Sequence, residues 1–163
     1  MRIFLTGATG YIGSAVLDTL LRNRHEVTAL VRDPEKAERL RLRGVQTVVG
    51  ELSVPKSYAN AAEASEVIIH TALDRSKLAA NVDRQAIDTL LGAAIRHSAK
   101  GHSVSLVYTS GVWVLGNTVG QAAEDEPVRP AAHAAWRPDH ERLVLEAGKG
   151  RTLRTSEIGR VHV

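Results

Sequence analysis

The residues best suited to chemistry near the start of the chain are three glycines in a short segment. Residues 6–13 read Thr-Gly-Ala-Thr-Gly-Tyr-Ile-Gly, which places Gly7, Gly10 and Gly13 at G-x-x-G-x-x-G spacing. Glycine adopts the backbone angles that a tight turn needs, and the free amides at the start of a helix attract negatively charged phosphates. Between a strand and a helix, this segment predicts a pyrophosphate site; a connector that binds nothing is the alternative.

The elements around this segment must place it at the edge of a sheet. Short runs rich in β-branched residues alternate with longer amphipathic runs, a pattern typical of a parallel α/β sheet. We predict strands at residues 2–6, 27–31, 47–49, 67–71, 104–109 and 151–158. Helices are predicted at 11–22, 34–43, 57–64, 81–97 and 137–147, and residues 110–135 are expected to be irregular. The predicted fold is α/β, a doubly wound Rossmann-type parallel sheet of about six strands in three layers.

The composition limits the classes of protein to which the chain can belong. Its 163 residues suit one domain, and the absence of cysteine excludes disulfides and cysteine-bound zinc. The net charge of +3 and the 4% aromatic content give little support to a nucleic-acid partner. The seven histidines lack the spacing of a metal site, and no apolar run is long enough to span a membrane. We therefore expect a cytoplasmic protein without a metal, membrane or nucleic-acid partner.

Residues 6–13 also resemble the opening of the extended short-chain dehydrogenase/reductase family, which includes the NAD-dependent epimerases and dehydratases. The resemblance continues at residues 50–52, 67–72, 81, 107–116 and 141–146. It implies that a nicotinamide dinucleotide is bound by the glycine turn and by residues that follow the later strands. The implied cofactor-binding residues are Gly7, Thr9, Gly10, Tyr11, Ile12, Gly13, Arg32, Glu51, Leu52, Thr71, Ala72, Asn81 and Thr109.

Arg32 makes NADP the favoured cofactor, with NAD as the alternative. It follows the second predicted strand, where an acidic residue accepts the ribose hydroxyl of NAD and a basic residue accommodates the 2′-phosphate of NADP. The planar guanidinium suits a phosphate, although Arg32 could instead pair with Asp33 or Glu35 in solvent. Other positions also have a plain structural interpretation: an exposed loop acid for Glu51, an ordinary strand end for Thr71 and Ala72, and a helix cap for Asn81.

The family's catalytic side chains are missing from their usual positions. The resemblance implies a serine or threonine after the fifth strand and a Tyr-x-x-x-Lys pair on the next helix. These positions fall on Gly111, Trp136 and His140. Glycine has no side chain, and indole has no proton that titrates near neutrality, so residue type excludes a Tyr-Lys-Ser mechanism. Ser110 and His133 are weak substitutes.

The other polar and aromatic residues of this region are predicted to be structural. His133 is expected to be exposed in a loop and His140 to lie on a solvated helix face, because the sequence shows no convergent acid or base partner. The alternative is that His133 and His140, which flank Trp136, act as general acid or base. Packing roles are expected for Trp113 and Trp136, and core positions for His70 and Tyr108.

Members of the family continue beyond the sixth strand into a substrate-binding region. The resemblance therefore implies that residues 1–163 form an NAD(P)-binding domain and that the substrate-binding C-terminal region is absent. The chain is then either an N-terminal fragment of a longer protein or a reduced, atypical member of the family. The predicted function is that of an NAD(P)(H)-binding oxidoreductase or epimerase with altered or weakened catalysis. The alternative is a non-catalytic NADP(H)-sensing regulatory module. The helices at 81–97 and 137–147 resemble those through which family members pair, which predicts a homodimer.

Overall fold

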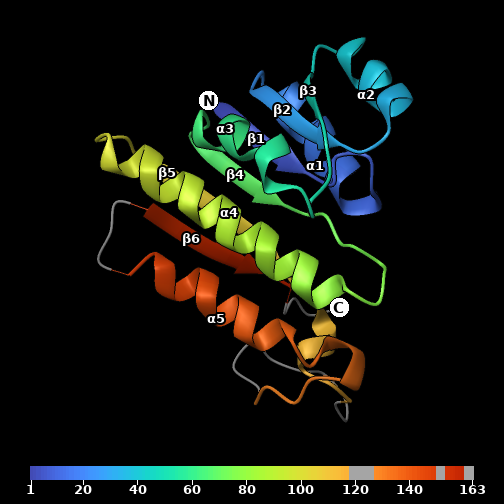
Figure 1. The fold of residues 1–163 in the computed structure, drawn as a ribbon, viewed down its shortest axis with the longest axis vertical. Helices are drawn as coiled ribbons and strands as arrows, with labels where there is room; N and C mark the ends of the chain where they lie inside the picture. The colour runs from blue at the N-terminus through green and yellow to red at the C-terminus, as the bar shows by residue number, and fades with distance from the viewer. Residues whose placement is uncertain (118–126, 150–152, 160–163) are drawn as a thin grey trace.

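The computed structural model describes residues 1–117, 127–149 and 153–159, whose strands form one parallel sheet. The strands are β1 (Arg2–Thr6), β2 (Glu26–Val31), β3 (Gln46–Val49), β4 (Val67–His70), β5 (Val104–Thr109) and β6 (Leu153–Ile158). The helices are α1 (Tyr11–Arg22), α2 (Pro34–Arg41), α3 (Ala59–Glu63), α4 (Ala79–Ala99) and α5 (Arg137–Ala147). The strand order β3-β2-β1-β4-β5-β6 confirms the predicted doubly wound α/β fold (Figure 1).

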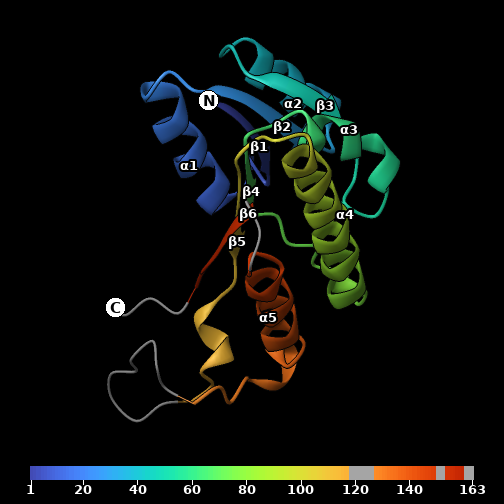
Figure 2. The ribbon, with the colours of Figure 1, turned by 90° about the vertical axis from the view of Figure 1, so that its left-hand side faces the viewer.

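Helices lie on both sides of the sheet, as Figure 2 shows edge-on. On one side, Leu17 of α1 and Leu40 of α2 share a core cluster with Leu5 of β1. On the other, the helices α3, α4 and α5 cover the sheet, and Leu90 of α4 packs in one cluster with Val144 of α5. Successive strand residues point to opposite faces, so the central strand β1 must be apolar on both faces to serve both cores.

The boundaries of α2 show how local residues start and stop a helix. The carboxylate of Asp33 accepts hydrogen bonds from the amides of Glu35 and Lys36, at 2.9 and 3.3 Å, and so caps the first turn. The helix ends at Arg41, earlier than the predicted residue 43. Gly44 follows with a φ of +81°, a left-handed conformation that glycine adopts easily after a helix.

The helix α4 begins earlier than predicted, at Ala79 instead of residue 81. The preceding turn is closed by side chains, because Asp74 accepts from the amide of Ser76 at 2.7 Å and Ser76 accepts from the amide of Leu78 at 3.1 Å. Leu78 therefore precedes the helix without a side-chain cap. The predicted cap role of Asn81 is wrong.

The helix α4 also ends later than predicted, at Ala99 instead of residue 97, and the remaining differences concern strand ends and short elements. The predicted helix at 57–64 is divided into a 3₁₀ turn, Pro55–Ser57, and α3. Two more 3₁₀ turns, Val112–Val114 and Ala132–Ala134, lie in the described parts of the segment 110–135. Residues 118–126 of that segment and residues 151–152 of the predicted last strand lie outside the described residues. In the part of the chain that is described, no helix is both long and apolar enough to cross a membrane.

Candidate functional site

The carboxyl ends of β1 and β4 form the candidate site. These strands are neighbours at the centre of the sheet, but their onward connections lead to opposite sides of it. After β1 the chain forms α1 on one face, and after β4 it forms α4 on the other, as Figure 2 shows. In open α/β sheets, ligands bind where the connections change direction in this way.

Two glycines bring the β1–α1 turn against the segment that follows β4. Gly7 has a φ of +77°, and a Cβ atom there would lie 2.7 Å from both the amide nitrogen of Ala72 and the hydroxyl oxygen of Thr71. A Cβ atom on Gly13 would lie 2.1 Å from the carbonyl oxygen of Gly7. Any side chain at these two positions would force the turn, the helix and the segment after β4 apart.

The first turn of α1 is open to an anion. Gly10 precedes the helix without a side-chain cap, and the first turn contains no acidic residue. Thr9 and Gly10 are exposed, and Tyr11 and Ile12 are 96% and 49% exposed, so these residues do not block the amides at the helix start. The free amides and the positive end of the helix dipole suit the two phosphates of a dinucleotide. The residues of the glycine turn therefore fit the predicted cofactor.

Thr6 fastens the end of β4 to the glycine turn. The hydroxyl of Thr71 donates to the carbonyl oxygen of Thr6 at 2.7 Å, and the amide of Ala72 donates to the hydroxyl of Thr6 at 3.3 Å. β4 ends at His70, so Thr71 and Ala72 belong to the connection and not to the strand. This connection lies directly beside the glycine turn, as a cofactor-contacting segment requires.

Arg32 is exposed immediately after β2, at the same edge of the sheet. Asp33 uses its carboxylate to cap α2, and Arg32 forms no ion pair with another described residue. The alternative in which Arg32 pairs with Asp33 or Glu35 is thus not formed. Hydrogen bonds from Ser76 hold the pKa of Asp74 below its ordinary value, and the nearby positive charge of Arg32 lowers it further. Arg32 therefore faces the segment after β4 with its charge available to an anion.

The remaining predicted cofactor residues lie on separate elements. Glu51 is exposed after β3 and accepts a hydrogen bond from the hydroxyl of Ser53 at 3.3 Å, while Leu52 packs against the core. Thr109, the last residue of β5, is half-buried and lies opposite Ile158 of β6. Their contacts with a cofactor stay predictions.

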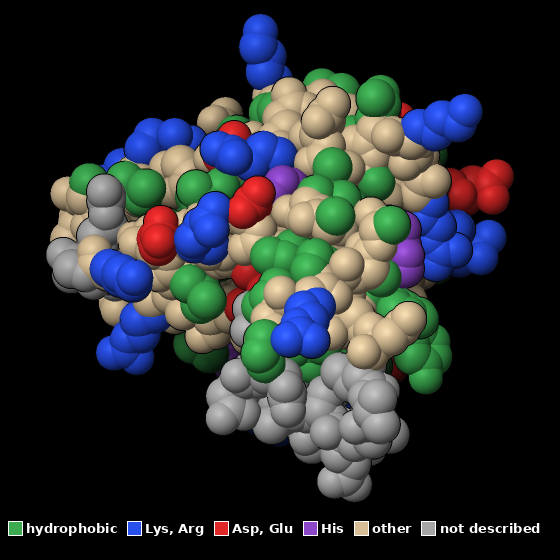
Figure 3. All heavy atoms as spheres, turned by 90° about the horizontal axis from the view of Figure 1, so that it is seen from below, with side chains coloured by type: hydrophobic (Ala, Val, Ile, Leu, Met, Phe, Trp, Pro, Cys, Tyr) green, Lys and Arg blue, Asp and Glu red, His purple; other side chains and the backbone are tan. Residues whose placement is uncertain are grey.

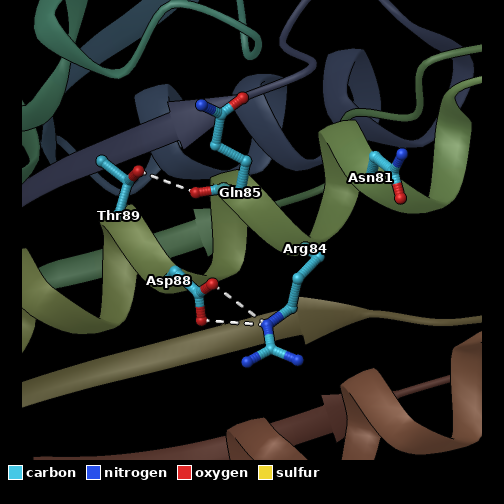
Figure 4. Close-up of a pocket in the computed structure, with 5 residues that line it drawn as sticks. All are labelled: Asn81, Arg84, Gln85, Asp88 and Thr89. Carbon is cyan, nitrogen blue, oxygen red and sulfur yellow. Dashed lines mark hydrogen bonds and ion pairs between the residues drawn. The ribbon is translucent and has the colours of Figure 1, made fainter.

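Asn81 lies in an open hollow on the outer face of α4, which Figure 4 shows in close-up. The other residues of this hollow are Arg84, Gln85, Asp88 and Thr89. The Nε atom of Arg84 lies 3.1 and 3.0 Å from the two carboxylate oxygens of Asp88, so their charges neutralise each other. The contact of Asn81 with a cofactor also stays a prediction.

A buried polar network lies beneath the carboxyl edge, and its centre is Asp83, a residue not predicted from the sequence. Asp83 is 2% exposed in the first part of α4. Its Oδ2 atom accepts a hydrogen bond from the hydroxyl of Tyr108 at 2.8 Å and lies 2.7 Å from Nδ1 of His140. Its Oδ1 atom lies 3.5 Å from Nε2 of His70. Side chains from β4, β5 and α5 thus converge on one carboxylate of α4.

The network keeps Asp83 ionised and Tyr108 protonated. Burial alone would raise the pKa of Asp83, but the interactions with His140, His70 and Tyr108 outweigh it, and the pKa lies below its ordinary value. Burial, reinforced by the negative charge of Asp83, raises the pKa of the Tyr108 phenol above its ordinary value. Tyr108 therefore holds Asp83 in place and does not exchange its own proton near neutrality.

His70 and Tyr108 occupy the core positions expected for them, each 1% exposed. The Nδ1 atom of His70 lies 2.6 Å from the hydroxyl oxygen of Thr6. Because Thr6 also accepts from the amide of Ala72, the network reaches from Asp83 to the segment beside the glycine turn. The buried groups and the candidate cofactor site are therefore physically connected.

His140 does not lie on a solvated helix face, so that prediction is wrong. It is 6% exposed, and its partner Asp83 comes from a helix 57 residues earlier in the chain. The sequence contained one usable signal, because Asp83 precedes Ile87 and Leu90 by one and two helical turns on the buried stripe of α4. A carboxylate on such a stripe requires buried partners.

Gly111 and Trp136 stand where the resemblance places catalytic side chains. Among the described residues, no heavy atom beyond Gly111 and its two chain neighbours lies within 4 Å of the position that a Cβ of Gly111 would take. The indole of Trp136 donates to the carbonyl oxygen of His133 at 3.2 Å, and its ring centre lies 4.9 Å from that of His140. The guanidinium of Arg137 lies 4.5 Å from the centre of the same ring. Trp136 therefore packs over His140, as a packing role predicts.

The two weak substitutes have different surroundings. The hydroxyl of Ser110 donates to the carboxylate of Glu141, which is 1% exposed. His133 is exposed, as expected, and its ring meets that of Trp113 edge-on at 5.2 Å. Trp113 is itself 54% exposed, because the turn Val112–Val114 buries Val114 in its place. Trp113 therefore packs against His133 at the surface.

Neither metal-ligating side chains nor the charges on the face seen in Figure 3 suggest another site. Among the described residues, no group of three or more potential ligands could hold a metal ion. On the face shown in Figure 3, Lys and Arg side chains are spread among acidic and hydrophobic ones and do not gather in one patch. This face offers no concentrated positive charge to a polyanion.

Solved structures of nucleotide-sugar enzymes share the fold. The UDP-glucose 4-epimerase of Thermus thermophilus in complex with NAD matches with a TM-score of 0.81 and 23% identity, covering 98% of this chain and 54% of that chain. A dTDP-glucose 4,6-dehydratase from Bacillus anthracis in complex with NAD matches with a TM-score of 0.78 and 17% identity, covering 96% and 54%. At this identity the similarity shows the fold alone.

Two curated relatives are more similar in sequence. The 4-hydroxy-2-methyl-3-oxo-4-farnesyl-3,4-dihydroquinoline-1-oxide ketoreductase of Stigmatella aurantiaca is 31% identical over 155 residues, covering 90% of this chain and 46% of the relative. The NAD(P)H azoreductase of Xenophilus azovorans is 31% identical over 154 residues, covering 93% and 46%. The chain spans about half the length of these relatives.

A family model described as NAD(P)H-binding matches residues 7–144. The match begins in the glycine turn and ends in α5, and together with the shared fold it confirms the resemblance found in the sequence. The chain therefore belongs to the NAD(P)H-binding family, among the relatives of the extended short-chain dehydrogenases/reductases, and its cofactor is a nicotinamide dinucleotide.

Proposed function

We propose that this chain binds NADPH at the carboxyl ends of β1 and β4 and takes part in a reduction by hydride transfer. Two relatives are named for such reactions, one as a ketoreductase and one as an NAD(P)H azoreductase. A bound nicotinamide dinucleotide supplies the hydride. The acceptor class that these names support is a carbonyl or azo group.

The observation that carries the proposal is the closure of the glycine turn on its neighbours. Gly7 and Gly13 leave no room for side chains, while the start of α1 has no side-chain cap and its first residues, Tyr11 and Ile12, are exposed. A connector that binds nothing does not require an uncapped helix start beside a tight glycine turn. This combination favours the dinucleotide interpretation over the empty connector.

The choice of NADP over NAD rests on Arg32. Its guanidinium has no ion-pair partner among the described residues, and Asp33 is occupied as the cap of α2. A free guanidinium at the end of β2 can bind the 2′-phosphate by two parallel hydrogen bonds. The same surroundings offer no carboxylate from β2 to a ribose hydroxyl, which disfavours NAD.

The reduction would be altered compared with that of the family, because Gly111 and Trp136 provide neither a hydroxyl nor a phenol. A chain that binds NADPH but lacks a proton donor would be a non-catalytic NADP(H)-sensing module. The buried pair Asp83–His140 favours the catalytic alternative, since it places a titratable group beside Trp136.

The test combines binding with turnover. Titration of the purified chain with NADPH and with NADH, followed by the cofactor's fluorescence, should show tighter binding of NADPH. Oxidation of NADPH should then be followed with an aromatic diketone and with an azo dye as acceptors. Tight binding with turnover supports the reductase, and tight binding without turnover of any acceptor favours the sensor. Absence of NADPH binding would contradict both.

Two further predictions concern the extent of the chain and its assembly into a dimer. The prediction that the substrate-binding C-terminal region is absent is checked by whether the coding sequence continues past Val163. The homodimer through α4 and α5 is checked by light scattering of the purified chain, where a monomer at all concentrations would contradict it.

A further inference from the structure

We propose that His140, oriented by Asp83, donates and accepts the proton of the reaction at the carboxyl edge of the sheet. The proposal rests on the proposed NADPH-dependent reduction and deepens it. Asp83 acts as a positioning residue, because it contacts His140 and lies below the surface. His140 acts as the group that meets the substrate oxygen or nitrogen.

The geometry of the pair fixes which nitrogen can react. Nδ1 of His140 lies 2.7 Å from Oδ2 of Asp83, and the ionised carboxylate can only accept a hydrogen bond. The proton of the neutral ring therefore resides on Nδ1, which leaves the lone pair on Nε2. A carboxylate that orients a histidine in this way is a recurrent arrangement in acid–base catalysis.

Within the network, the side chain of His140 is more exposed to solvent than those of His70 and Asp83. The side chains of His70 and Asp83 are 1% and 3% exposed, whereas that of His140 is 8% exposed. The ring of Trp136 contacts that of His140 at an inclination of 58°, and Trp136 itself is half-buried just before α5. Of these three titratable groups, His140 is the most accessible to a substrate.

The position of the network suits a reaction beside the nicotinamide. Thr6, His70 and Tyr108 stand at or next to the ends of β1, β4 and β5, where the candidate cofactor site lies. Asp83 and His140 lie near the starts of α4 and α5, which follow those strands. His140 is thus placed at the same edge as the glycine turn but on the opposite face of the sheet.

The reduction needs only the hydride of the reduced dinucleotide and one proton from His140. In a carbonyl substrate, the carbon accepts the hydride and the oxygen gains negative charge. That oxygen then takes the proton from Nε2 of the His140 imidazolium. The N–H bond on Nε2 breaks, an O–H bond forms, and the proton on Nδ1 remains on its hydrogen bond to Asp83. Solvent then returns one proton to Nε2. General acid catalysis of this kind typically accelerates a reaction by about 10²–10⁴-fold.

Other titratable and charged groups near His140 would also affect how the reaction rate depends on pH. His70 and Tyr108 face Asp83 from β4 and β5, and Arg137 of α5 lies 3.4 Å from the Tyr108 hydroxyl. Glu141, the neighbour of His140 in α5, adds a second buried carboxylate. For this reason the decisive measurements are of the tautomer and accessibility of His140, not of a rate against pH.

The first measurement is the protonation of the two ring nitrogens of His140 by ¹⁵N NMR of the intact chain without cofactor. We expect the proton on Nδ1 in the neutral ring. In Asp83→Asn, we expect the preference for Nδ1 to be lost, while Asp88→Asn, a change of the exposed partner of Arg84, should leave it intact. A neutral wild-type ring protonated on Nε2 would overturn the proposal, even if Asp83→Asn fails to fold.

The second measurement is modification of histidines by diethyl pyrocarbonate, followed by mass spectrometry. His140 should react, and NADPH should protect it. At NADPH about 100-fold above its Kd, about 1% of the sites are free, so modification should slow by up to about 100-fold. The exposed His102, beyond the far end of α4, should react equally with and without NADPH. Failure of His140 to react, or reaction unaffected by saturating NADPH, would overturn the proposal; absence of NADPH binding would instead overturn the proposed function.

Discussion

Gly13 of α1 and Gly7 of the preceding turn are in direct backbone contact, so that a Cβ atom on Gly13 would lie 2.1 Å from the carbonyl oxygen of Gly7. The same carbonyl accepts a hydrogen bond from the amide of Gly10 at 2.8 Å and cannot move away without breaking the turn. This contact sets how α1 leaves the sheet, and therefore where its first amides point.

Replacing Gly13 by alanine should destabilise the protein and weaken NADPH binding. The added methyl group must displace the Gly7 carbonyl, and overpacking of this kind costs about 1–3 kcal/mol. Urea unfolding and NADPH titration measure the two effects. Gly92→Ala in α4 is the matched control, because its Cβ would meet only the flexible end of Arg96 at 3.2 Å. That change should stabilise the helix by up to about 1 kcal/mol.

Replacing Gly10 by aspartate should abolish NADPH binding without unfolding the protein. Gly10 precedes α1 with a φ of −89°, a conformation open to any residue, and aspartate is a favourable residue at that position. Its negative charge would repel the phosphates. Gly10→Ala adds bulk without charge and should weaken binding less. Unchanged NADPH affinity in the aspartate variant would contradict the location of the site.

Replacing Arg32 by alanine should reduce the affinity for NADPH but not for NADH. Hydrogen bonds to a charged group contribute about 1.5–3 kcal/mol, which corresponds to a loss of roughly 10- to 150-fold. Arg39→Ala in α2 serves as the control, since Arg39 is exposed and pairs with Glu35 at 3.8 Å. An equal loss for both cofactors would show that Arg32 does not read the 2′-phosphate.

Glu63 should make stability fall in acid. Hydrogen bonds from Arg96 and then Lys100, at 2.6 and 2.7 Å, hold the pKa of Glu63 at about 2, below its ordinary value of 4.5. A carboxyl with a lowered pKa contributes stability that is complete above the ordinary pKa and is lost as the pH falls through the folded value. The free energy of unfolding of Glu63→Gln should thus lie below that of the wild type at neutral pH and converge with it near pH 2.

The matched control for that series is Asp88→Asn, which removes an exposed pair within a single helix. Pairs of this kind contribute little, so its unfolding free energy should follow the wild type closely at every pH. If the unfolding free energies of Glu63→Gln and Asp88→Asn depend on pH in the same way, the ion pairs of Glu63 between α3 and α4 do not contribute to stability.

The fold was predictable because its signals are local. The bounds of β1, α1, β5 and α5 agree with the sequence patterns, since apolar periodicity and the glycines that flank them act within a few residues. The start of α4 was predicted less well, because hydrogen bonds from Asp74 and Ser76 close a turn that the apolar pattern does not reveal.

The sequence by itself determined the parallel α/β sheet, the glycine turn and the position of Arg32 after β2. These depend on spacing along one segment, and backbone chemistry follows directly from such spacing. Only the tertiary structure decided the partners of Asp83 and the burial of His140. Those groups come from α4 and α5, and a buried carboxylate is stable only where folding brings distant donors within hydrogen-bond reach.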